Sequence, residues 1–185
     1  MTFLKPLTLC FGLALLAACG ASDRIAVQSP PVAEKIRIGF ASVEVKDVSL
    51  PSYAAADEIA QQAADGTIVS SGVQWGDAPE RAIGLEISRN LARMSGRRVA
   101  PEPWPFEEEA SAALDVRFIE LIAGMDGIFR ANGQYFVGVF NGRERSGLFD
   151  LTVAYDPKGG PAAIARARGQ IVLDLTAFIA RNGLR

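Results

Sequence analysis

Histidine is absent from all 185 residues, and cysteine occurs only twice, at Cys10 and Cys19. Without histidine the chain cannot build a Ser-His-Asp triad, a Cys-His pair or the usual zinc ligand sets. If Cys10 belongs to a segment that is cleaved off, Cys19 is the one cysteine of the mature chain and no internal disulfide can form. These absences make most enzyme classes hard to build, and we expect no catalytic residues, no metal and no cofactor.

An excess of charge of either sign is also lacking. Lysine and arginine number 19 and aspartate and glutamate 21, which gives a net charge of −2. Such a chain has no basic surface for nucleic acid and no electrostatic attraction to an anionic bilayer. The N-terminal apolar run, residues 7–18, is shorter than the roughly 20 residues that a membrane-spanning helix needs.

That run has the length of a secretory signal, and it ends in a motif typical of bacterial lipoproteins. Lys5 supplies the positive charge that precedes it, and Leu16-Ala17-Ala18-Cys19 fits a lipobox. We expect cleavage between Ala18 and Cys19 and acyl chains such as palmitate on Cys19, because several chains together anchor a protein stably. The alternatives are an ordinary signal that leaves a free cysteine, or a short membrane anchor.

The sequence predicts three regions. Residues 1–18 form the signal peptide, and residues 19–34 form the lipidated cysteine and a flexible tether that is small, polar and proline-containing. Stretched out, the tether could span at most about 50 Å. Residues 35–185 form one domain, since their number suffices for a single core.

Apolar patterning places the first elements of this domain. Near-alternation over 36–45 predicts a strand with an irregularity at 41–42. Residues 58–63 and 67–73 flank Ala64-Asp65-Gly66 and predict a hairpin, although the alanine-rich stretch 54–64 could instead form a helical turn.

A helix is expected over 78–95, where Asp77 can cap the first turn, Glu80 completes a capping box and Gly96 ends the last turn. Apolar residues recur on one face of it every three or four positions: Ile83, Ile87, Leu91 and Met94.

The C-terminal half alternates again after a proline-rich segment, residues 101–106, that excludes a helix. Strands are expected over 113–122, 127–140 and 146–155, joined by short turns that favour antiparallel neighbours, and a last helix over 162–180. The fold class predicted is therefore α+β: a mainly antiparallel sheet with two helices packed on one face.

Short motifs dispersed in this order make the chain similar to a known family. They comprise the strand 36–45, Leu50-Pro51-Ser52-Tyr53, Ile59, Trp75-Gly76-Asp77, Asn90-Leu91-Ala92, Pro103-Trp104, the strand Leu114 to Glu120 and the closing helix. With the lipobox, they resemble the ABC-type transport auxiliary lipoproteins of the PqiC/YmbA kind. The chain departs from the family pattern at Ala54-Ala55 and at Ala60-Gln61-Gln62.

The resemblance implies a non-catalytic lipoprotein of the cell envelope. Such proteins work with mammalian-cell-entry (MCE) type proteins and an associated permease and ATPase in lipid transport, and members are thought to form homo-oligomeric rings. It implies a docking or receiving role for the periplasmic end of the transport system at the outer membrane. Gly20 agrees with this location, because aspartate at that position commonly retains lipoproteins in the inner membrane.

The residues themselves suggest where a partner could bind. Trp104 and Phe106, set between prolines, could form a rigid aromatic contact, as could Tyr53 beside Pro51; each could equally pack on the core. Arg143 and Arg145 lie in an expected hairpin tip, where a partner contact competes with a simple solvated turn.

Two other functions stay open at this stage. The protein could assist assembly of an envelope enzyme or inhibit it, using the same loops. A lipid-anchored hydrolase would need a Ser-Lys pair, and the mature chain offers only Lys35, Lys46 and Lys158, none in a recognisable nucleophile motif.

Overall fold

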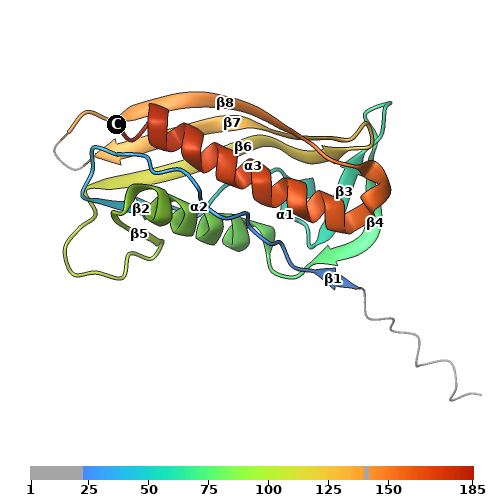
Figure 1. Ribbon diagram of the computed structural model, residues 1–185, viewed down its shortest axis with the longest axis horizontal. Coiled ribbons are helices and arrows are strands. Elements are labelled where there is room, and N and C mark those ends of the chain that lie inside the picture. The colour runs from blue at the N-terminus through green and yellow to red at the C-terminus, as the bar shows by residue number, and fades with distance from the viewer. Residues whose placement is uncertain (1–22, 140–141) are drawn as a thin grey trace, which may run out of the picture.

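One mixed sheet, covered on one side by two long helices, makes up the protein (Figure 1). The computed structural model describes residues 23–139 and 142–185. Helix α2 spans Pro79–Ser95 and α3 spans Gly160–Asn182, and the two contact each other over the sheet. A single-turn helix, α1, covers Ser52–Ala55, and a 3-10 turn, η1, covers Pro157–Gly159 ahead of α3.

Within the described residues, eight strands form the sheet. Their bounds are β1 Arg24–Ile25, β2 Ser42–Val45, β3 Glu58–Gln62, β4 Ile68–Trp75, β5 Arg98–Pro101, β6 Ala112–Gly124, β7 Ile128–Val139 and β8 Arg145–Ala154. The longest registers, β6 with β7 and β7 with β8, are antiparallel, as their short links predict. Strand β6 also pairs in parallel with β2 near its start and with β3 at its end. The predicted α+β class is confirmed.

The core lies between the helices and the inner face of the sheet. On β6 the alternating residues Leu114, Val116 and Phe118 are buried, as their spacing predicts. The expected stripe of α2 is buried against them, and α3 adds a second stripe: Ile164, Ile171, Leu175 and Ile179. Burial of these stripes is the main favourable term that holds both helices on the sheet.

The ends of the early elements follow local chemistry, with one correction. The 58–73 hairpin is confirmed, with Gly66 at φ 86° in its turn. Gly96, at φ 67°, ends α2 as expected. Asp77 does not cap α2: Ala78 occupies the N-cap, and the Asp77 carboxylate pairs with Arg81 instead.

The strand expected over 36–45 is wrong in its first half, because β2 begins only at Ser42. Ile36 and Ile38 are buried, as alternation predicts, but their segment bonds to helix ends rather than to a neighbouring strand. The Ile36 N–H donates to the Met94 carbonyl at 3.0 Å, and the Gly39 N–H to the Leu184 carbonyl at 2.7 Å.

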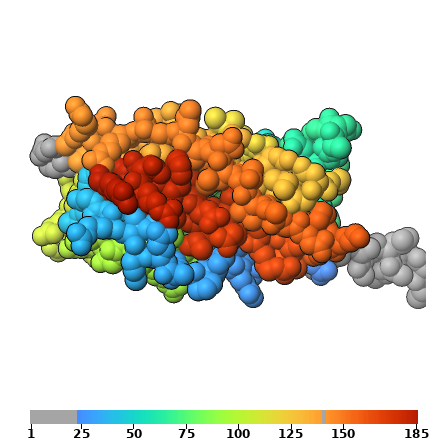
Figure 2. Space-filling view, turned by 45° about the horizontal axis from the view of Figure 1, so that its top comes forward, coloured from blue at the N-terminus to red at the C-terminus, as the bar shows by residue number. Residues whose placement is uncertain are grey.

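Residues within the predicted tether, 19–34, already pack against the domain. Arg24 and Ile25 form β1, which pairs with the end of β4, and Val27 and Val32 pack against the core. Figure 2 shows this N-terminal segment (blue) lying against α3 (orange to red). We call residues 23–34 the N-terminal strap. Its few apolar side chains pack it against the core. Residues 1–22, which include the predicted signal peptide and Cys19, lie outside the described residues.

Candidate functional site

The loop between β5 and β6, residues 102–111, projects from one end of the sheet (Figure 1). We call it the aromatic loop. It brings together two of the predicted contact residues: the rings of Trp104 and Phe106 meet edge to face with centroids 4.8 Å apart. The Trp104 Nε1–H donates to the Glu108 carbonyl at 2.7 Å, and the Arg98 guanidinium lies 5.2 Å from the centre of the Phe106 ring.

Both ends of the aromatic loop are fastened to β2 and the residues just after it. At its start, the Glu102 N–H donates to the Val45 carbonyl at 2.8 Å and the Glu102 carboxylate pairs with Lys46 at 3.0 Å. The hydrogen bond from Lys46 lowers the pKa of Glu102. At its end, the Ser111 N–H donates to the Ser42 hydroxyl at 2.9 Å. The loop therefore holds a partly buried Trp104 and a Phe106 that is 43% exposed in a fixed arrangement.

A groove of about 410 Å³ runs beside Trp104 on the face of the sheet that the helices leave open. Residues from three strands and the aromatic loop line it: Glu44, Trp104, Glu109, Ala110, Ala113, Gly138 and Val139. We call it the Trp104 groove. The sequence predicts its aromatic side but not the strand positions opposite, which depend on register.

The two predicted hairpin arginines have different surroundings. Arg143 is exposed. Arg145 lies at the start of β8, where it donates to the Gly183 carbonyl at 3.2 Å and to the Arg185 carbonyl. Its guanidinium also stands 5.7 Å from the Phe40 ring centre. Arg145 therefore binds the C-terminal residues of the chain, whereas Arg143 is open to solvent.

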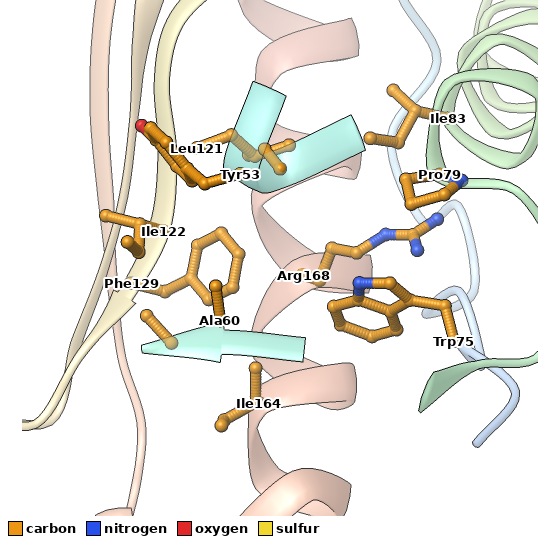
Figure 3. Close-up of a pocket in the computed structure, with 12 residues that line it drawn as sticks. Tyr53, Ala60, Trp75, Pro79, Ile83, Leu121, Ile122, Phe129, Ile164 and Arg168 are labelled. Carbon is orange, nitrogen blue, oxygen red and sulfur yellow. The ribbon is translucent and has the colours of Figure 1, made fainter. Parts of the chain in front are cut away.

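Pro51 and Tyr53 lie away from the aromatic loop, at α1. The Pro51 carbonyl accepts the N–H groups of Ala54 and Ala55, which forms the single helical turn. Tyr53 is partly buried, and this burial raises the pKa of its hydroxyl. It lines a small cavity between α1, β6 and α3 (Figure 3). The structure therefore does not join these two residues to Trp104 and Phe106.

The cavity beside Tyr53 has room for about one water molecule, at about 20 Å³. Within the described residues, its lining is mostly apolar, and Arg168 is its one charged residue, which Figure 3 shows beside Trp75. The Arg168 guanidinium lies 4.8 Å from the centre of the Trp75 ring and donates to the Glu86 carboxylate at 2.9 Å. With side chains only 3% and 11% exposed, Arg168 and Glu86 form a buried ion pair between α3 and α2.

Burial dominates the protonation behaviour of this pair. It raises the pKa of Glu86, which the charges of Arg168 and Arg89 lower only in part. It also lowers the pKa of Arg168. The sequence offers no signal for this pairing, because Glu86 lies 82 residues before Arg168. The pair is thus a largely buried link between the two long helices.

Within residues 23–139 and 142–185, no three carboxylate, histidine or cysteine side chains come together as metal ligands. The run Glu107-Glu108-Glu109 is exposed. In the same part of the chain, none of the helices has the length and apolar character needed to cross a membrane.

Comparison with known proteins identifies one family. The model of the family described as "ABC-type transport auxiliary lipoprotein component" matches residues 24–180. The sequence matches none of the curated proteins.

Two of the similar solved structures share the fold. One is an uncharacterised protein with 19% identity and a TM-score of 0.70, the match covering 86% of this chain and 97% of that one. Another is protein XCC0632 from Xanthomonas campestris, with 12% identity, a TM-score of 0.61 and coverages of 85% and 94%. PelC from Paraburkholderia phytofirmans, solved as a dodecamer, has 14% identity, coverages of 81% and 97%, and a TM-score of 0.41. The last similarity is too loose to say how this chain assembles.

Proposed function

The chain belongs to the family of ABC-type transport auxiliary lipoprotein components, and from this premise we propose that it is a docking subunit of a lipid transport system. It acts without catalysis, anchored in the outer membrane by acyl chains on Cys19 and facing the periplasm. Its partner is an MCE-type protein that works with a permease and an ATPase.

The aromatic loop is the observation that carries this proposal. Its prolines, the hydrogen bond from Trp104 and the fastening of both ends to β2 and the residues just after it keep two aromatic rings in place before a partner arrives. Preorganised aromatic side chains suit binding, because little conformational entropy is lost when the partner docks and tryptophan is enriched at binding hot spots. The geometry therefore favours recognition over chemistry.

The anchor rests on the sequence of the N-terminal segment. The lipobox Leu16-Ala17-Ala18-Cys19 supports acylation, and Gly20 supports sorting to the outer membrane. We expect Cys19→Ser to stay uncleaved or to be released as soluble protein. Labelling with a clickable palmitate analogue and separation of the two membranes on a sucrose gradient measure both points. Processed, membrane-bound Cys19→Ser protein would contradict the anchor.

Docking is tested by photo-crosslinking in intact cells. A photoreactive amino acid replaces Phe106 in the full-length chain, and a control replaces Thr152, an exposed position on β8. We expect the Phe106 position, and not the control, to capture an MCE-type protein that mass spectrometry identifies. Capture of a soluble envelope enzyme alone would favour the assembly or inhibitor role, and capture of nothing would refute docking at this loop.

A homo-oligomeric ring, implied by the family, is part of the proposal. Native mass spectrometry of the acylated protein in detergent tests it, and a mass equal to one chain at micromolar concentration would count against it.

A further inference from the structure

We propose that the Trp104 groove receives a lysine or arginine side chain from an extended segment of the partner protein. This inference rests on the proposed docking function and names the chemistry of the partner at the same site. It follows from the floor of the groove, from the charge on its wall and from the ring of Trp104.

The floor of the groove consists of two small residues on neighbouring strands, Ala113 and Gly138, with Glu44 beside them on the third strand. Glu44 of β2 pairs in register with Ala113 of β6, which pairs with Gly138 of β7. The next row on this face, toward the middle of the strands, is Asp115 and Phe136, which carry larger side chains. A Cβ added at Gly138 would meet no atom within 4 Å, so the space above it is open. The register therefore leaves a depression wide enough for one side chain.

The wall of the groove is acidic and includes a carboxylate that forms no ion pair within the described residues. Glu109 lines it and forms no ion pair in the part of the chain that the structure describes. Glu44, at the other side, is already paired with Lys46 at 2.9 Å. An incoming cation would therefore meet the Glu109 carboxylate, and an incoming anion would be repelled.

Trp104 supplies the second feature that a cation needs. Its Nε1–H is bound to the Glu108 carbonyl, so its orientation is fixed. The neighbouring Phe106 ring already carries the Arg98 guanidinium at 5.2 Å, which shows that aromatic rings of this loop hold cations. A cation over an aromatic ring contributes about 0.5–1 kcal/mol at exposed sites. A ring and a carboxylate on one groove together select lysine or arginine.

Three of the nearby cations already have partners within the chain: Lys46 bridges Glu44 and Glu102, Arg98 stacks on Phe106, and Arg145 holds the C-terminal carbonyls. Arg143 is open to solvent and does not line the groove. The unpaired carboxylate of Glu109 therefore favours an external cation. Because the floor crosses neighbouring strands, the segment that carries this cation is expected to be extended.

The test uses the full-length acylated protein with the photoreactive residue at Phe106. Glu109→Lys reverses the wall charge, and its matched control is Glu107→Lys, an exposed loop residue that does not line the groove. Gly138→Val fills the floor, and its control is Thr152→Val. We expect Glu109→Lys and Gly138→Val to lower the yield of crosslinked partner about fivefold or more. Both controls are expected to keep the yield of the parent.

Peptide mapping of the crosslinked product gives the decisive result. A partner segment with lysine or arginine close to the crosslinked residue supports the inference. Full capture by Glu109→Lys, or a segment without basic residues, overturns it while leaving docking intact. A crosslink to a second copy of this chain also overturns it. If the parent captures no partner, docking itself fails. Circular dichroism of each variant confirms folding.

Discussion

The Arg168 guanidinium of α3 donates to the Glu86 carboxylate of α2 at 2.9 Å, in the interface between the two long helices. The other Glu86 oxygen, Oε2, and Arg168 Nε are buried without a hydrogen-bond partner among the described residues. An ion pair so buried gains attraction in a medium of low dielectric but loses hydration, so each charge depends on the other. The relationship ties the N-terminal half of the fold to its last helix.

We expect Glu86→Leu to lower the free energy of unfolding by about 3–5 kcal/mol, because it leaves the Arg168 charge buried without a partner. The double variant Glu86→Leu/Arg168→Met is expected to recover most of that loss, since both charges are gone. Urea unfolding followed by circular dichroism measures both variants. Losses that simply add in the double variant would show that the pair is not coupled.

The same glutamate gives a pH dependence of defined sign. Burial raises the pKa of folded Glu86 above the usual 4.5, so above that pH the folded protein holds a proton that the unfolded chain has released. The Glu86 contribution to stability is therefore present at low pH and is lost as the pH rises from 4.5 through the folded pKa. Glu86→Gln is expected to lack this decline, as urea midpoints between pH 4 and 8 should show. Parallel curves for the two proteins would contradict the prediction.

Two helical glycines are expected to respond oppositely to alanine. At Gly169 a Cβ would stand 2.9 Å from the Gln28 carbonyl oxygen of the N-terminal strap, whereas at Gly84 it would meet nothing within 4 Å. Gly169→Ala should therefore loosen the strap and speed trypsin cleavage after Arg24, which limited proteolysis measures, because a protease needs the backbone released from β1 pairing. Gly84→Ala should stabilise α2 by about 0.5–1 kcal/mol, because alanine is the better helix former. Equal strap cleavage in both variants would contradict this account.

The hairpin arginines offer another matched pair. Arg145→Ala removes the donor to the Gly183 carbonyl and the cation beside Phe40. We expect a loss of about 0.5–1.5 kcal/mol in unfolding free energy, the net contribution of an ordinary hydrogen bond, because Arg145 is exposed to solvent. Arg143→Ala, at an exposed position, is expected to leave thermal unfolding unchanged. Equal melting temperatures for the two variants would show that Arg145 does not hold the C-terminal residues.

Local patterns explain which parts of the fold the sequence predicts. Helix α2 has its apolar stripe and its terminal Gly96 within one segment, and β6 to β8 follow from alternation and short links. The strap escapes prediction because prolines and polar residues separate Ile25, Val27 and Val32. The strand predicted to begin at Ile36 does not form there. Alternation of apolar residues indicates which side chains are buried, but not which backbone carbonyls accept hydrogen bonds from the segment.

The candidate site also combines features that the sequence predicts with features that it does not. Trp104 and Phe106 are near in sequence, so their pairing could be expected from residue type and prolines alone. The floor of the Trp104 groove depends on the register of three strands, and the Glu86–Arg168 pair joins residues 82 positions apart. Relations of that kind are set by tertiary packing, which a single sequence does not display.

The early start of the fold sets how far the domain can stand from a bilayer. Only residues 20–23 lie between Cys19 and β1, and a linker of this length can span at most about 17 Å. With Cys19 acylated as proposed, the β1 end of the domain rests near the lipid surface. Figure 1 places the aromatic loop at the other end of the molecule, away from β1. The long axis of the domain would then point away from the membrane, with the aromatic loop at the end that faces the periplasm.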